Sequence, residues 1–219
     1  MPQLRIGIDL DNTLAGYDSV FPGAARERGL LPEGFRGGKA EVRALVRGLA
    51  DGERQWQALQ GRVYGALMSQ AQLIEGAADF LDRARAAGAE LRIVSHRTEH
   101  GHFDPDRVNL RQAAWAWMMN NGFFSPDGFG LHMEEIYFEA TRADKIARIA
   151  ALDLTHFIDD LPDLFEDPTF PEGPERLLLA LRGAPISPCY RAYEGWPAIT
   201  EAVFGSVAPR RSSRAPADS

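Results

Sequence analysis

Acidic side chains end two apolar segments of this chain, in a pattern that suits divalent-metal chemistry. Asp9 and Asp11 stand one residue apart at the end of the first apolar segment, and Asp159 and Asp160 end a later one. Carboxylate oxygens are hard ligands of the kind that Mg²⁺ prefers, and Mg²⁺ in such a site keeps several waters and accepts a substrate phosphate. A helix cap or a turn explains one acid in such a place but not the whole set. The pattern therefore predicts a magnesium site.

A serine and a lysine complete a set of groups that suits phosphate chemistry. Ser95 ends another apolar segment, and Lys145 lies in the sequence TRADKIARI, which has helical spacing. A phosphate dianion repels a carboxylate nucleophile, so a metal ion and a lysine together are needed to make the encounter tolerable. The chain contains both the acidic ligands for a metal ion and a suitable lysine.

These side chains need a scaffold that brings strand ends together, and the hydrophobic pattern predicts one. Short apolar runs alternate with segments of helical spacing, which indicates an α/β fold with a Rossmann-like, mostly parallel sheet flanked by helices. In such a sheet, ligands bind beyond the carboxyl ends of the strands, near the point where the strand order reverses. The expected strands are 3–9, 91–94, 135–138 and 154–158, with 176–181 as a strand or a helix, and the expected helices are 76–88, 107–121, 141–152 and 196–204.

Residues 15–75 differ from the rest of the chain. They are rich in Gly, Arg and Ala, and their apolar residues recur at helical spacing without any strand pattern. We therefore expect a small helical cap inserted after the first strand, with a core made of 1–14 and 76–207 and a disordered tail over 208–219. The candidates for substrate selection in the cap are Arg36, Lys39, Arg43, Trp56 and Tyr64.

Composition argues against several classes of function. The net charge is −7, and the one basic cluster is Arg210, Arg211 and Arg214 in the expected tail, so no nucleic-acid partner is expected. The single cysteine, Cys189, excludes an internal disulfide and a multi-cysteine metal site, and we expect it to be a packing residue. No apolar run is long enough for a membrane span and no signal-peptide pattern opens the chain, so we expect a cytoplasmic protein.

Four short segments, in order along the chain, resemble the signatures of the haloacid dehalogenase superfamily of hydrolases. Residues 6–14 (IGIDLDNTL) resemble the first signature and residues 92–95 (RIVS) the second. Lys145 is well placed for the third, and residues 157–163 (FIDDLPD) resemble the acidic fourth. The resemblance spans about residues 4–165 and implies a hydrolase of the phosphatase type, with its helical cap at the superfamily's commonest position.

The resemblance also implies a role for each residue that matches a signature. Asp9 is the nucleophile that forms an aspartyl-phosphate, and Asp11 protonates the leaving oxygen and then activates water. Ser95 hydrogen-bonds a phosphoryl oxygen, and Lys145 neutralises charge on the phosphoryl group and on Asp9. The implied Mg²⁺ ligands are Asp9, the backbone carbonyl of Asp11, and Asp160, with Asp159 as a rival to Asp160 or as a residue behind it.

Residues next to these signatures are candidates for substrate binding: Asn12, Thr13, His96 and Arg97. Thr13 is also expected to orient the loop that carries the acids. Arg97 has two interpretations, because it suits either a bidentate grip on a substrate phosphate or carboxylate, or a salt bridge to an acid of the loop.

Two further clusters have a functional and a structural interpretation. His100, His102, Asp104 and Asp106 have spacing that invites a zinc site, but without supporting cysteines a longer active-site loop is favoured. The aromatic and Met residues of the helix 107–121 suit either a ligand surface or the core. Core packing is favoured because Trp115 shares a helical face with Met118 and with Met119, with Trp117 nearby in sequence.

The expected function is the Mg²⁺-dependent hydrolysis of a small-molecule phosphomonoester, of the nucleotide or sugar phosphate class. A phosphotransferase or phosphomutase is the alternative within enzymes, and a non-catalytic phospholigand-binding module is the alternative outside them. A carbon–halogen hydrolase is disfavoured because its leaving group needs no acid such as Asp11. The sequence leaves the substrate and the oligomeric state open.

Overall fold

A six-stranded parallel sheet forms the centre of the fold in the computed structural model, which describes residues 3–180 and 186–205. The expected tail, 208–219, lies outside the described residues. The strand order is β5-β4-β1-β6-β7-β8, and every neighbouring pair is parallel. The strands are β1 (Arg5–Ile8), β4 (Glu90–His96), β5 (Ile136–Glu139), β6 (His156–Asp159), β7 (Glu175–Leu179) and β8 (Arg191–Tyr193).

The chain reverses its direction across the sheet at β1. It runs from β1 outward to β4 and β5, then returns to the other side of β1 to form β6, β7 and β8. The register places Ile8 beside Ile93 of β4 and Ile158 of β6, so the three central strands end close together. The topology therefore creates the strand-order reversal at which α/β proteins bind ligands. The expected Rossmann-like fold class is confirmed.

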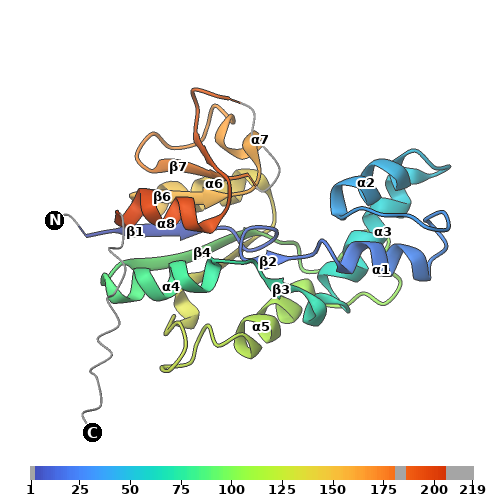
Figure 1. The fold of residues 1–219 in the computed structure, drawn as a ribbon, viewed down its shortest axis with the longest axis horizontal. Coiled ribbons are helices and arrows are strands. Elements are labelled where there is room, and N and C mark those ends of the chain that lie inside the picture. The colour runs from blue at the N-terminus through green and yellow to red at the C-terminus, as the bar shows by residue number, and fades with distance from the viewer. Residues whose placement is uncertain (1–2, 181–185, 206–219) are drawn as a thin grey trace, which may run out of the picture.

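Both faces of the sheet are buried because its strands carry apolar residues on each side. One face packs against α4 (Ala77–Ala86) and α8 (Trp196–Phe204), which lie side by side (Figure 1). The other face packs against α6 (Arg142–Ala151) and α7 (Pro162–Phe165). Gly7 of β1 is required by this packing, because a Cβ there would lie 2.5 Å from side-chain atoms of Leu154 and Phe157.

Residues between β1 and α4 form a group of helices beyond the ends of the strands (Figure 1). Its core includes Phe21 and Trp56, whose rings stack with centroids 5.0 Å apart, and Val42, Val46 and Leu59, all fully or almost fully buried. The helical insertion that we expected is confirmed. Its helices are α1 (Val20–Glu27), α2 (Lys39–Arg47), α3 (Gly52–Tyr64) and a 3-10 turn, Met68–Gln70.

The expectation that this insertion lacks strands was wrong. Two-residue strands, β2 (Ala15–Gly16) and β3 (Gln72–Leu73), pair antiparallel where the chain leaves and re-enters the core. Each is too short to give a period-2 pattern, so only the meeting of distant segments reveals them. The strand β8 and the helix α7 are also too short to give a recognisable hydrophobic pattern, so the sequence did not predict them.

The helix α5 (Leu110–Asn120) differs in one respect from its expected packing. Met118 is fully buried and Trp117 almost so, and the Trp117 Nε1 donates to the Ala71 carbonyl at 2.8 Å. Met119, however, is 64 % exposed, so its assignment to the core was wrong. Helical spacing defines which residues share a face, but a partly covered helix presents only part of that face to its neighbours.

Among the described residues, no helix has the length and apolar character needed to cross a membrane. Cys189 is half-buried and packs against the cluster beneath α6 and α7, as expected of a packing residue.

Replacing Phe80 with alanine should lower the free energy of unfolding by about 3–5 kcal/mol, the usual cost of an aromatic cavity in a core. Phe80 is fully buried on α4, and its ring centroid lies 4.7 Å from that of Trp196. Asp82→Ala, at an exposed position of the same helix, is the matched control and should change stability by less than about 0.5 kcal/mol. Urea denaturation followed by circular dichroism measures both. Equal effects would contradict the α4–α8 packing.

Candidate active site

Asp9 and Lys145 form the centre of the candidate site. Asp9 directly follows β1, and its backbone N–H donates to the Ile158 carbonyl of β6 at 2.9 Å. Lys145 reaches over from α6, whose first turn is capped by the Thr141 hydroxyl accepting from the Asp144 N–H. The Lys145 Nζ donates to the Asp9 Oδ1 at 2.6 Å and to the Asp159 Oδ2 at 2.7 Å, and all three side chains are buried.

The residues after Asp9 form a tight turn that fixes the direction of its side chain. Asn12 adopts a positive φ of 62°, and its N–H donates to the Ala15 carbonyl at 2.7 Å. The Thr13 hydroxyl lies 3.4 Å from the Asp9 Oδ2, while the Trp196 Nε1 of α8 donates to the Thr13 carbonyl at 2.9 Å. Asn12 lines the pocket described below, whereas Thr13 is fully buried and orients the turn.

Asp11 is held by a buried arginine and a tyrosine. The Tyr17 hydroxyl donates to the Asp11 Oδ1 at 2.5 Å, and the Arg97 Nη2 donates to the same oxygen. The Arg97 Nη1 donates to the carbonyls of Leu110, at 3.0 Å, and Tyr64, at 3.1 Å. Of the two interpretations of Arg97, the structure contains the salt bridge to a loop acid. Arg97 thereby ties β4, α5 and the helical insertion to Asp11.

Three carboxylates lie close enough together to hold a metal ion. Asp9, Asp159 and Asp160 each offer an oxygen, and these oxygens lie within 4.8 Å of one another. Both Asp159 oxygens have partners, because Oδ2 accepts from Lys145 and Oδ1 accepts from the Leu161 N–H at 2.9 Å. Asp160 lines the pocket instead. A hard, anionic oxygen set of this kind fits Mg²⁺, with Asp160 better placed than Asp159 as a direct ligand.

The electrostatics of this cluster favour a cation. Burial, with the charges of Asp159 and Asp11, raises the pKa of Asp9 to about 7 although Lys145 opposes the shift. Burial, Asp159 and Asp9 also raise the pKa of Asp160. Burial alone would lower the pKa of Lys145, but Asp159 and Asp9 raise it above its usual value. The lysine is therefore fixed in its charged form, yet it does not fully offset the burial and mutual repulsion of the carboxylates, so a further cation would stabilise their ionised form.

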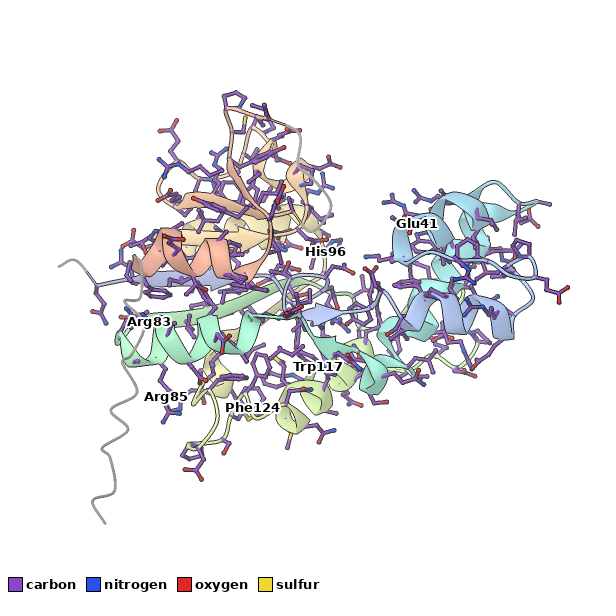
Figure 2. The ribbon with its side chains drawn as sticks, viewed as in Figure 1. Glu41, Arg83, Arg85, His96, Trp117 and Phe124 are labelled. Atoms are coloured by element: carbon purple, nitrogen blue, oxygen red, sulfur yellow. The ribbon has the colours of Figure 1, made fainter. Side chains whose placement is uncertain are left out.

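Ser95 and His96 end β4 beside this cluster. The Ser95 hydroxyl is buried outside the lining of the pocket described below, and it has no hydrogen-bond partner among the described residues. His96 lies on the side of the core that faces the insertion (Figure 2), and its Nε2 is 3.1 Å from the Ala140 carbonyl. Burial, with the nearby charges of Lys145 and Arg142, lowers the pKa of His96, which favours the neutral imidazole.

A pocket of about 530 Å³ opens between the core and the helical insertion, with Asp9 and Lys145 among its lining residues. Of the candidate selectivity residues, Arg36 is not part of its wall. The candidates that do line it are Lys39, Arg43, Trp56 and Tyr64, together with Asp11, Asn12, His96, Arg97 and Asp160. A volume of this size suits a small molecule.

The loop 99–106 packs on the insertion and shows no zinc site. Gly101 lies so close to Gly61 of α3 that a Cβ on either residue would clash, and the buried Asp104 also contacts Gly61. Among the described residues, the metal-ligand group is the Asp9 cluster, and neither His100 nor His102 belongs to such a group. His102 lines the pocket, which agrees with the preferred interpretation of an active-site loop.

Sequence reasoning missed Tyr17 as a member of the site. The residue is 1 % exposed, and its contact with Asp11 depends on the turn from Asn12 to Ala15 folding back. A tyrosine six residues after an acid carries no motif, so no sequence signal identified it.

Comparison with known proteins supports the fold. No family model and no curated protein matches the chain. Among solved structures, it resembles a haloacid dehalogenase-like family hydrolase from Xanthomonas campestris (15 % identity, TM-score 0.51, covering 91 % of this chain and 95 % of that one). It also resembles a HAD family hydrolase from Deinococcus radiodurans with bound phosphate and sodium (17 %, 0.56, 92 % and 95 %) and a protein described as a dehalogenase (14 %, 0.53, 94 % and 99 %). The chain therefore has the haloacid dehalogenase-like fold.

Mg²⁺ should bind more tightly as the pH rises from about 6 to about 8, because a proton competes with the metal for a carboxyl whose pKa is about 7. Below that pKa Asp9 is protonated, so metal binding releases a proton. Calorimetry in two buffers of different ionisation enthalpy measures the affinity and the number of protons released. His96→Asn is the control, since it should leave the proton release unchanged. An affinity independent of pH over this range would contradict the assignment.

Proposed function

We propose that this protein is a hydrolase of the haloacid dehalogenase superfamily that cleaves a small-molecule phosphate monoester with the help of Mg²⁺. The observation that carries the proposal is the buried Asp9 carboxylate, held by Lys145 and flanked by two further carboxylates at the floor of a pocket. A carboxylate in this setting suits attack on phosphorus, because fixed positive charge beside it offsets the repulsion between the two anions. The phosphate bound in the Deinococcus radiodurans structure supports the substrate class.

In the first step, Asp9 attacks phosphorus and the bond from phosphorus to the substrate oxygen breaks. The Asp9 Oδ1 is engaged by Lys145, whereas the Oδ2 has a single long contact with Thr13, so Oδ2 is the freer nucleophile. The Lys145 ammonium neutralises charge on the carboxylate and the transferring group. The unpartnered Ser95 hydroxyl is suited to donate a hydrogen bond to a phosphoryl oxygen.

Asp9, Asp160 and the backbone carbonyl of Asp11 would hold the metal ion. When bound there, Mg²⁺ would neutralise charge on the phosphoryl oxygens. Asp159 would stand behind these ligands, since its oxygens are engaged by Lys145 and by the Leu161 N–H.

Asp11 would move the protons of both half-reactions. It would give a proton to the leaving oxygen in the first step, and in the second it would take one from the water that cleaves the aspartyl-phosphate. Arg97 and Tyr17 hold this carboxylate in one orientation within the pocket wall, which is the positioning that proton transfer requires. Arg97 is thus better explained as a positioning residue than as a substrate ligand.

The alternative functions can be compared by what each would require of the same side chains. A phosphotransferase or phosphomutase would use the same first step and replace water with another hydroxyl, and nothing at Asp11 discriminates between the two. A carbon–halogen hydrolase needs neither an acid for its leaving group nor a cluster of metal-binding carboxylates beside its nucleophile. A non-catalytic module should have lost Asp9, Asp11, Lys145 or Asp160, and all four are present. The cytoplasmic location and the absence of a nucleic-acid partner stay predictions.

Replacing Asp9 with asparagine should reduce phosphatase turnover by about three orders of magnitude or more, because the attacking charge is lost while the shape is kept. Lys145 retains Asp159 as its partner, so the fold should survive. The measurement is phosphate release from a panel of phosphometabolites, with and without chelator. Asp82→Asn, at an exposed acid of α4 outside the pocket wall, is the matched control and should stay close to the parent protein. Near-parental turnover in the Asp9 variant would contradict the mechanism.

Replacing Asp11 with asparagine should have an effect that depends on the leaving group. An alkyl phosphate, whose alkoxide leaves poorly, should lose about two to four orders of magnitude in rate, the usual effect of a positioned acid–base. An activated aryl phosphate should be cleaved in the first step with much less loss. Dephosphorylation would remain slow, so the aryl alcohol should appear as a pre-steady-state burst.

Mg²⁺ affinity of the Asp11 variant controls for damage to the site, because the backbone carbonyl of residue 11 is retained. An equal loss for both substrates in the first turnover, without a burst, would show that Asp11 has a structural role only.

A further inference from the structure

A row of cations runs along the pocket side of α2. Lys39, Arg43 and Arg47 are four residues apart, and all three line the 530 Å³ pocket that also contains Asp9 and Asp160. A spacing of four residues places side chains one above another on a helix, with a rise of about 6 Å per step. The row begins near the carboxylates, because Lys39 is the member whose charge acts on Asp160. It therefore extends from the reaction centre toward the outer part of the pocket.

Two of these cations, Lys39 and Arg43, form no direct ion pair among the described residues. Arg47 pairs with Glu53 at 2.7 Å, as Arg97 and Lys145 pair with acids of the core. Within residues 3–180 and 186–205, Lys39 and Arg43 have no carboxylate oxygen within the 4.0 Å of an ion pair. Two cations that line a pocket without an ion-pair partner favour an anionic ligand there.

Lys39 is held in place by aromatic rings. Its Nζ lies 5.6 Å from the ring centroid of Phe21 and 5.7 Å from that of Tyr64, in cation–π contact with both. The half-buried side chain is thus directed into the pocket instead of extending into water. It is well placed to meet an anion close to Asp160, whereas Arg43 lies one helical step farther out.

The facing helix contributes neutral polar groups. Gln57, Gln60 and Tyr64 of α3 recur at helical spacing along the same pocket. Amide and phenol groups suit the hydrogen bonds of an uncharged polar linker, while the cations of α2 suit its charged end.

We propose that the pocket binds a phosphate monoester that carries a second anionic group, a carboxylate or a phosphate, and that Arg43 is the main ligand of this second group. The phosphate that reacts at Asp9 would lie beside Lys39, and the second anion would lie about 6 Å from it, one four-residue step along α2. The inference rests on the proposed function for the reacting phosphate, and it defines what distinguishes the substrate from a simple alkyl phosphate.

Binding of non-hydrolysable phosphonates tests the inference without relying on turnover. Three ligands differ only at the far end: butylphosphonate is neutral there, 4-phosphonobutyrate carries a carboxylate, and butane-1,4-bisphosphonate carries a second phosphonate. Calorimetry on the Mg²⁺-loaded protein should give at least tenfold tighter binding for one or both of the doubly anionic ligands than for butylphosphonate. The tighter of the two identifies the kind of second anion.

Arg43→Gln should remove most of this advantage and leave butylphosphonate binding within about twofold of the parent. Arg36→Gln is the matched control, because it removes the same charge from an exposed position of the insertion outside the pocket wall. It should keep the parental preference.

Equal affinities for the three ligands would overturn the second-anion site, as would an equal loss of preference in the two variants. Loss of the phosphatase function alone would appear differently, as absent turnover with the ligand preference intact.

Discussion

The buried ammonium group of Lys145 is the interaction on which the rest of the site depends. It lies between Asp9 and Asp159, at the junction of β1, β6 and α6. Three carboxylates grouped this closely in a protein interior would repel one another and incur a large desolvation penalty, so they need a fixed positive charge. The fold meets this need with the ammonium group of Lys145 from α6, and the three carboxylates remain close enough together to hold a metal ion.

A second buried pair connects the core to the helical insertion. Arg97 reaches Asp11 with one nitrogen and the carbonyls of Tyr64 and Leu110 with another. A guanidinium suits this position because its planar donors satisfy several acceptors at once, which a lysine in the same place does not do. The position of α3 and the orientation of the Asp11 carboxylate are therefore coupled through one side chain. A change in the packing of α3 would therefore alter the position of the Asp11 carboxylate.

The core and the helical insertion contribute different kinds of side chain to the pocket. The core contributes the carboxylates at the strand ends and the lysine of α6, while the insertion contributes the cations of α2 and the polar groups of α3. The close approach of Gly61 and Gly101, which excludes any side chain between them, holds the loop 99–106 against the insertion. Under the proposed function, different segments that meet at one cavity would carry the chemistry and the substrate choice.

The sequence by itself determined the parallel α/β core, which segments form the strands that carry the acids, and the helical character of residues 15–75. These features follow from local hydrophobic periodicity and from the end of each strand, which are properties of short segments. It also indicated Asp9, Asp11 and Asp160, because these acids follow the strand ends, and it indicated Lys145 through the resemblance to a family signature. The tertiary structure alone decided that Arg97 pairs with Asp11, that Tyr17 joins them, that Met119 is exposed, and that β2 and β3 meet. Each of these depends on contacts between residues distant in the chain or on how far neighbouring elements cover a helix, and no local pattern encodes such a contact.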